Sequence, residues 1–188
     1  MPVTLESKEH IWTALTSLAS APIEERTMTG LSVLLQSNDL KLALKPYCVG
    51  GPYGRLLDAE AETLGDASVI AFETEGLLET GAAPAVLAYL FHRIADRLDG
   101  RPTMIVIDEG WLALGDPAFA KQLGEWLVTL RKKNASVVFA TQSLAQLENS
   151  TIAPAIIESC PTRLLLPNER AIEPQITAIY RRFGLNDR

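Results

Sequence analysis

The 188-residue sequence has few of the residues that build metal centres or disulfide frameworks. It contains two cysteines and two histidines, and Cys48 and Cys160 match no metal-ligand spacing. A structural zinc site is therefore not indicated. We expect both cysteines to be buried, reduced thiols of a cytosolic protein.

Long hydrophobic runs and an excess of positive charge are also absent. Charges or prolines interrupt every apolar stretch before the roughly 20 residues that a membrane-spanning helix requires, and the N-terminus lacks a signal-peptide pattern. Any membrane association is therefore expected to be peripheral. The formal net charge is −6, so charge does not indicate direct nucleic-acid binding.

The sequence also lacks a phosphate-binding loop. Such a loop has the form GxxxxGK[ST], in which backbone N–H groups and a lysine hold the phosphates of a nucleotide, but this chain has no Gly-Lys pair. The glycine-rich stretch VGGPYGR is no substitute, because Pro52 within it and Pro46 shortly before it lack N–H donors, and no lysine follows. We expect a loop without regular structure there, and a join between two parts of the chain near residues 46–66.

Hydrophobic residues make up 47% of the chain, and their spacing differs between its two ends. Towards the N-terminus, apolar positions recur at helical spacing, which predicts helices over residues 6–20, 29–36 and 39–45. Farther along, strand and helix patterns alternate. Strands are predicted at 67–75, 101–108, 135–143 and 162–167, and helices at 84–98, 117–133, 152–159 and 174–183, with Asp116 as an N-cap.

Apolar strands separated by helices are typical of a parallel sheet that helices cover on both faces. The fold class is therefore predicted to be α/β, with a helical subdomain at residues 1–55 and the sheet domain at residues 56–188. Three tryptophans are expected in the core or at an interface rather than as platforms for base stacking: Trp12, Trp111 and Trp126.

The segment PTMIVIDEGW places two carboxylates directly after an apolar strand. Ligands of open parallel sheets bind at the carboxyl ends of the strands, where Asp108 and Glu109 are expected. The pattern is typical of a Walker B motif, in which the first carboxylate holds Mg²⁺ through water and the second polarises the water that attacks the γ-phosphate. The motif alone is equally compatible with Asp108 as a cap and Glu109 as a solvated acid.

The next predicted strand also ends in polar residues, Thr141, Gln142 and Ser143. A carboxamide at that position is suited to sensing a γ-phosphate or orienting water. The same three residues are also typical of the start of a turn, so this motif by itself leaves both interpretations open. Together, the two strand ends favour the hydrolytic half of a nucleotide site without its phosphate-binding half.

Five segments, in the same order, resemble the C-terminal part of the TrbE family of conjugative-transfer ATPases and their type IV secretion relatives. They are GGPYGRLLDAE, YLFHRIADRLDGRPTMIVIDEGW, EWLVTLRKKNASVVFATQSL, IIESCPTRLLLPN and YRRFGL. The resemblance implies part of a RecA-like parallel sheet flanked by helices. It also implies a hexamer at the cytoplasmic face of the inner membrane that works with other type IV secretion components and powers pilus assembly and transfer of DNA or protein.

The resemblance assigns ATP and Mg²⁺ as cofactors of the whole protein. It assigns Asp108 and Glu109 to Walker B, with Asp108 holding Mg²⁺ through water, and it places Gln142 in the strand-end motif at the nucleotide site. It also implicates Arg131, and either Arg181 or Arg182, in reaching a phosphate across a subunit boundary; each of these is also explained as a solvated helix residue.

The sequence departs from the family pattern by lacking the Walker A loop and the large N-terminal domain. Met1 is therefore expected to mark the boundary of a fragment or of a truncated gene, and the chain alone is expected to lack ATP turnover. The alternative hypothesis is a non-catalytic interaction or assembly module of the secretion apparatus. A sheet without its Walker A strand is also expected to expose an apolar edge, which predicts self-association or marginal solubility.

Overall fold

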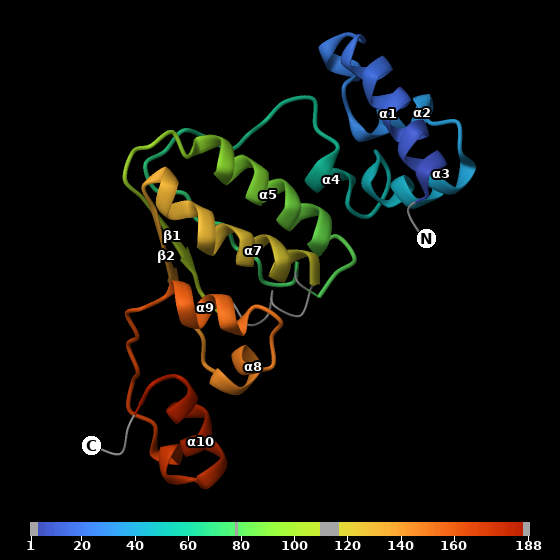
Figure 1. The fold of residues 1–188 in the computed structure, drawn as a ribbon. Helices are drawn as coiled ribbons and strands as arrows, with labels where there is room; N and C mark the ends of the chain where they lie inside the picture. The colour runs from blue at the N-terminus through green and yellow to red at the C-terminus, as the bar shows by residue number, and fades with distance from the viewer. Residues whose placement is uncertain (1–3, 78, 110–116, 186–188) are drawn as a thin grey trace. The chain divides into compact units, whose positions relative to one another are not determined.

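The computed structural model describes residues 4–77, 79–109 and 117–185, and the chain divides into two compact units, Met1–Ala82 and Ala83–Arg188 (Figure 1). The division falls at the start of a long helix. The predicted boundary between residues 55 and 56 lies inside the first unit, and as a domain boundary it stays a prediction. No helix among the described residues is long and apolar enough to cross a membrane.

The first unit is helical, as its sequence pattern predicts. Its elements are α1 (Leu5–Ala19), η1 (Ile23–Glu25), α2 (Met28–Leu34), α3 (Asn38–Leu44), η2 (Lys45–Tyr47) and α4 (Gly54–Leu57). Thr4, Thr27 and Ser37 begin α1, α2 and α3, because each side chain accepts a hydrogen bond from the backbone N–H three residues on. The core of this unit is formed by Ala14, Leu35 and Leu40, with Ile11, Leu31 and Leu44 packed against them.

The glycine-rich stretch is more regular than predicted. We expected no regular structure there, but Pro46 lies in the first turn of η2, where its missing N–H is not needed. Gly54 begins α4, and a Cβ at this position would lie 2.3 Å from the carbonyl oxygen of Cys48. Close backbone approach therefore explains this glycine. Cys48 is a buried free thiol, and Cys160 is a partly buried one.

Asp58 connects separate segments of the first unit through hydrogen bonds. One carboxylate oxygen accepts a hydrogen bond from the backbone N–H of Thr29 at 3.0 Å, and the other accepts from the Thr29 hydroxyl at 2.5 Å and from the Val49 N–H at 2.6 Å. Burial raises the pKa of Asp58, but these hydrogen bonds outweigh burial and hold the pKa below its ordinary value of 3.8. The ionised carboxylate therefore stabilises the folded unit.

The second unit contains a short parallel sheet among helices. Its elements are α5 (Ala83–Arg97), β1 (Thr103–Ile107), α7 (Pro117–Thr129), η3 (Leu130–Lys133), β2 (Ala135–Phe139), α8 (Leu144–Glu148), α9 (Ala153–Ser159), η4 (Glu169–Ile172) and α10 (Pro174–Arg182). β1 and β2 are parallel, in a register that runs from Thr103 opposite Ala135 to Ile107 opposite Phe139. The predicted parallel pairing of these two segments is confirmed. The predicted N-cap Asp116, like Trp111, lies outside the described residues.

Two other predicted strands are wrong. Residues 67–75 and 162–167 are not strands in the described structure, where only β1 and β2 pair. Apolar composition favours an extended chain, but a strand also requires a hydrogen-bonding neighbour. Val69 is 84% exposed and Leu164 is 90% exposed, so neither segment lies in a core.

The prediction that helices cover both faces of the sheet is also wrong for the described residues. Alternate residues of each strand are exposed, and the register places Met104 and Val106 on the same face as Val138. These three side chains are 67%, 62% and 45% exposed, respectively. The opposite face of the sheet is partly buried. One apolar face of the sheet is therefore open among the described residues, whereas the predicted exposure of an apolar edge stays a prediction.

An aromatic cluster holds α5 and α7 together in the second unit. The ring of Phe91 lies 5.0 Å from that of Phe119 and 4.2 Å from that of Trp126, in an edge-on arrangement with the tryptophan. Leu123, between the two α7 aromatics, is fully buried. Figure 1 shows α5 and α7 running side by side next to the strands. The expectation that Trp126 lies in the core is thus confirmed.

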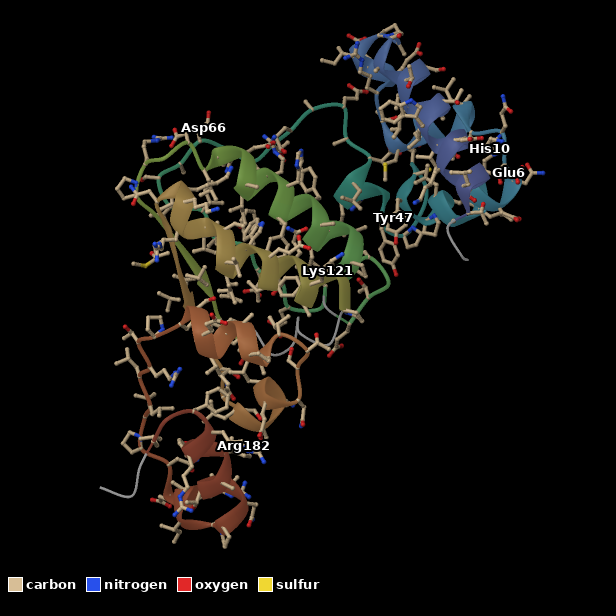
Figure 2. All side chains as sticks on the ribbon, viewed as in Figure 1. Glu6, His10, Tyr47, Asp66, Lys121 and Arg182 are labelled. Carbon is tan, nitrogen blue, oxygen red and sulfur yellow. The ribbon has the colours of Figure 1, made fainter. Side chains whose placement is uncertain are left out.

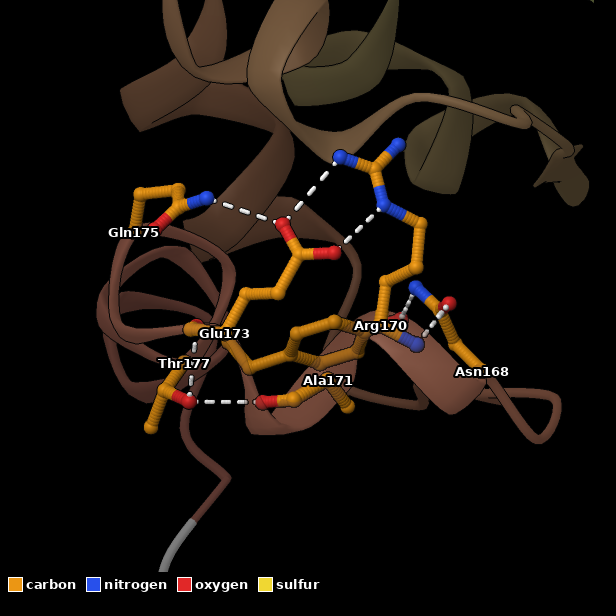
Figure 3. A network of polar contacts seen from close by, with 7 residues as sticks. Asn168, Arg170, Ala171, Glu173, Gln175 and Thr177 are labelled. Atoms are coloured by element: carbon orange, nitrogen blue, oxygen red, sulfur yellow. Dashed lines mark hydrogen bonds and ion pairs between the residues drawn. The ribbon is translucent and has the colours of Figure 1, made fainter.

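Polar contacts order the C-terminal part of the second unit (Figure 3). Arg170 Nε donates to one oxygen of Glu173 at 2.8 Å and Nη2 donates to the other at 3.1 Å, while Gln175 also donates to this carboxylate at 2.8 Å. The hydrogen bond from Arg170 lowers the pKa of Glu173. The pair lies at the solvent-exposed junction between η4 and α10, so it sets the geometry of that junction.

Candidate functional site

The candidate site lies at the carboxyl ends of the two strands. Asp108 and Glu109 directly follow β1, and Gln142 follows β2 by three residues. Because the strands are parallel and in register, both segments leave the sheet at the same edge. Gln142 Nε2 donates a hydrogen bond of 2.9 Å to Glu109 Oε1. The structure thus brings together residues that lie on separate motifs of the sequence.

Glu109 has an unusual backbone conformation. Its φ is +49°, and the other non-glycine residue with positive φ in the described structure is Asn134, at +56°. Asparagine tolerates this left-handed region, whereas a residue with a longer side chain is destabilised there by roughly 1–2 kcal/mol. The Glu109 N–H donates to Asp108 Oδ1 at 2.9 Å, which supports the turn. Such strain at a strand end is typical of functional sites.

The loop that presents Gln142 is held by its two neighbours. The Ser143 N–H donates to the Thr141 hydroxyl at 3.2 Å, and this hydroxyl donates to the Ser143 carbonyl at 3.4 Å. Ser143 Oγ accepts from the Gln146 N–H at 3.3 Å and so begins α8. The helix α8 and the positioning role of Thr141 and Ser143 were not predicted. The Ser-x-x-Gln spacing of a capping box was the available signal.

The donor set of the site fits a magnesium ion that is shared with phosphates. Among the described residues, no group of three or more His, Cys, Asp or Glu side chains is close enough to hold a metal. Asp108 and Glu109 are both exposed and offer two carboxylates. Mg²⁺ in nucleotide sites is held by one or two carboxylates, with phosphates and water completing its coordination. The chain therefore supplies a fitting part of such a site, not a complete one.

The three arginines implicated by the resemblance lie elsewhere in the second unit. Arg131 is in η3, which precedes β2, so it lies at the opposite end of this strand from Gln142. Arg182, at the end of α10, forms an ion pair with Glu148 at the end of α8. A function of Arg131, Arg181 or Arg182 across a subunit boundary stays a prediction.

Comparison with known proteins gives matches along the whole chain. The chain is 43% identical over 188 residues to a probable conjugal transfer protein TrbE of Sinorhizobium fredii, a match that covers 99% of this chain and 28% of that protein. It is 47% identical over 156 residues to the conjugal transfer protein TrbE of Rhizobium radiobacter, covering 82% of this chain and 19% of that protein. It is 35% identical over 174 residues to the type IV secretion system protein virB4 of Bartonella quintana, covering 90% of this chain and 22% of that protein.

The chain thus spans less than a third of the length of each of these relatives. The sequence identities of 35–47% to these relatives confirm the predicted resemblance to TrbE and the type IV secretion proteins. Residues 28–188 match the TraG P-loop domain family. This range includes Asp108, Glu109 and Gln142, and helix α1 lies before it in the sequence. The chain therefore belongs to the TraG P-loop domain family and is homologous to the TrbE and virB4 proteins.

Proposed function

We propose that this chain is the Walker B half of a RecA-like ATPase domain that powers conjugative transfer or type IV secretion. The observation that carries the proposal is the hydrogen bond between Gln142 and Glu109. It joins the motif that ends β1 to the motif that ends β2, and hydrolysis of a nucleotide requires these two motifs to lie next to each other. Membership in a P-loop family supports nucleotide binding by the longer protein.

In this proposal the first carboxylate binds the metal and the second activates water. Asp108 would hold Mg²⁺ through a water ligand, and a bound ion would supply positive charge that offsets the charge of the phosphates. Glu109 accepts a hydrogen bond from the attacking water and takes up its proton at Oε2, because Oε1 already accepts from Gln142. The left-handed φ of Glu109 turns the backbone directly after β1.

Gln142 orients the Glu109 carboxylate through its hydrogen bond to Oε1. Its carboxamide has a second donor hydrogen and an acceptor oxygen, which suit it to sensing the γ-phosphate. Thr141 and Ser143 hold its loop, and α8 follows directly. A change of partner at Gln142 is therefore passed to the start of a capped helix, which is how the site would link hydrolysis to movement.

The phosphate-binding half of the site must come from outside the sequence of this chain. Without a Gly-Lys loop the chain has no cradle for the β- and γ-phosphates, so we propose that it turns over ATP only in combination with a Walker A segment. We also propose, from the resemblance to TrbE, that the longer protein forms a hexamer at the cytoplasmic face of the inner membrane with other type IV secretion components as partners.

A second candidate function is a non-catalytic interaction module of the secretion apparatus. The open apolar face of the sheet, with Met104, Val106 and Val138, favours it, because parallel sheets are normally covered on both faces. The two candidates differ in one respect: only the ATPase requires the carboxylate of Glu109.

A segment exchange tests the choice between them. This chain replaces the matching segment of TrbE from Rhizobium radiobacter, and both conjugal transfer and ATP turnover of the purified chimaera are measured. We expect Glu109→Gln to lower turnover by about 10²-fold or more, the usual effect of losing a general base, and to abolish transfer. Glu125→Gln, on the exposed surface of α7, is the matched control. Full transfer by the Glu109→Gln chimaera would instead support the interaction module.

A further inference from the structure

Helix α1 has a second apolar face that lies apart from the core of its own unit. Ala14 and Ile11 lie on the face that packs against the core of the first unit. On another face, Leu5 is 75% exposed, Trp12 is 73% exposed and Leu15 is 43% exposed. Single exposed apolar residues are ordinary, but three on one stripe of a helix, including a tryptophan, are typical of an interaction surface.

The spacing of these residues follows the a and d positions of a heptad. Leu5 and Trp12 occupy successive a positions, while Lys8 and Leu15 occupy the d positions. We call these four residues the α1 stripe. Lys8 is exposed and is the one charged residue within the stripe, whose other members are apolar. The other charged residues of α1 lie outside the stripe; Figure 2 labels one of them, Glu6.

The α1 stripe is complementary to itself when two copies of the helix run antiparallel. In such a pair each a position faces a d position of the partner, so Leu5 of one copy packs against Leu15 of the other. Lys8 then lies opposite Trp12 of the other copy, where its ammonium group can stack on the indole ring. The same two contacts occur twice because of the two-fold axis, as expected for an isologous interface. In a parallel pair Lys8 would face Lys8, which is unfavourable.

We propose that the α1 stripe is a self-association surface that binds a second copy of this chain in an antiparallel helix pair. The exposed side chains of both copies would bury on the order of 800 Å² in total, which is less than the roughly 1,000 Å² of a stable specific interface, so we expect a weak, transient dimer. α1 precedes residues 28–188, which match the family domain, and packs against residues 31–44 of that range through Ile11 and Ala14. The proposed contact is independent of the proposed nucleotide chemistry.

Sedimentation of the full chain over a range of concentrations measures the association. We expect a monomer–dimer equilibrium that Trp12→Ala and Lys8→Glu each weaken by about tenfold or more, the usual effect at an interface hot spot. Val33→Ala, a change at a 73% exposed position of α2, is the matched control and should leave the equilibrium unchanged. Circular dichroism checks that each variant keeps its helix content. A chain that stays monomeric at millimolar concentration would overturn the proposal.

Two further results separate this surface from the open face of the sheet and test the orientation of the helices. If Val106→Thr abolishes the dimer while Trp12→Ala does not, the sheet face is the contact and the proposal is wrong. For orientation, chains carrying Leu5→Cys and Leu15→Cys are mixed under mild oxidation, in a background with Cys160→Ser. We expect the mixed disulfide to form much faster than either homodimer disulfide. Preferred linkage of Leu5→Cys chains to each other would contradict the antiparallel pair.

Discussion

Replacing Glu109 by glycine and by alanine provides a direct test of the backbone strain at the candidate site. Both substitutions remove the carboxylate and its hydrogen bond to Gln142, so this loss cancels when the two variants are compared. At the observed φ of +49°, a Cβ destabilises the residue by roughly 1–2 kcal/mol. Glycine has a greater entropy loss on folding, which reduces its advantage by roughly 0.5–1 kcal/mol. We therefore expect the glycine variant to be the more stable by roughly 0.5–1 kcal/mol.

The assay is equilibrium unfolding in urea, with stability taken from the midpoint and the slope of each transition. Lys121, an exposed residue of α7, supplies a control with ordinary helical backbone. At this position alanine should be more stable than glycine by about 1 kcal/mol, the reverse order. If alanine is as stable as glycine at position 109, the left-handed conformation is not strained and the strain argument fails.

Three further substitutions test the packing and polar contacts of the two units. Asp58→Asn should destabilise the chain by about 2 kcal/mol at pH 7 in thermal unfolding, because it weakens charged hydrogen bonds to Thr29. The pKa of Asp58 is lowered in the folded state, so this stabilisation is complete above the ordinary pKa of 3.8 and is lost as pH falls through the folded pKa. If the stability difference between the original chain and Asp58→Asn is the same at pH 3 as at pH 7, this explanation is contradicted. Leu123→Ala should lower the free energy of unfolding in urea by about 2–5 kcal/mol. Val128→Ala, at a 65% exposed position on the same helix, should lower it by less than about 0.5 kcal/mol. Similar decreases for the two variants would refute the assigned core face. Arg163→Met removes hydrogen bonds to the backbone carbonyls of Phe183, at 2.7 Å, and Ile157, at 2.8 Å. We expect faster amide hydrogen exchange in α10 as a result. Unchanged exchange would show that these contacts do not stabilise the helix.

Helices were predictable from the sequence where one apolar face and its end signals coincide. α1, α5 and α10 were predicted within one or two residues of their observed bounds, and each has a regular apolar spacing that local sequence reveals. α8 was missed because it has only five residues, too few for a periodic pattern. Local periodicity thus identifies elements that bury one side along several turns.

Strands were less predictable, because a strand depends on a neighbour that the local pattern does not contain. The segments with Val106 and Val138 pair with each other, whereas those with Val69 and Leu164 are equally apolar and pair with nothing in the described structure. Composition does not distinguish the two cases. The coverage of the sheet was wrongly predicted for the same reason, since it depends on the elements that lie beyond each face.

The sequence predicted where the candidate site lies in the chain, but not how its side chains and backbone are arranged. The position of Asp108 and Glu109 at a strand end, and of Gln142 at the next, follows from apolar runs that stop at polar residues. The hydrogen bond from Gln142 to Glu109 and the left-handed backbone of Glu109 depend on strand register and loop conformation. Neither leaves a residue-type signal, because glutamate is not a residue that favours positive φ.

Calorimetric titration of the purified chain with ATP and Mg²⁺ tests the central claim most directly: this chain carries the hydrolytic half of a nucleotide site without its phosphate cradle. Glu109→Gln is titrated alongside, because it suppresses turnover while keeping the shape of the side chain. We expect no binding up to about 1 mM nucleotide, which corresponds to a binding free energy weaker than about −4 kcal/mol. Tight, Mg²⁺-dependent binding would contradict the account, because another element of this chain would then hold the phosphates.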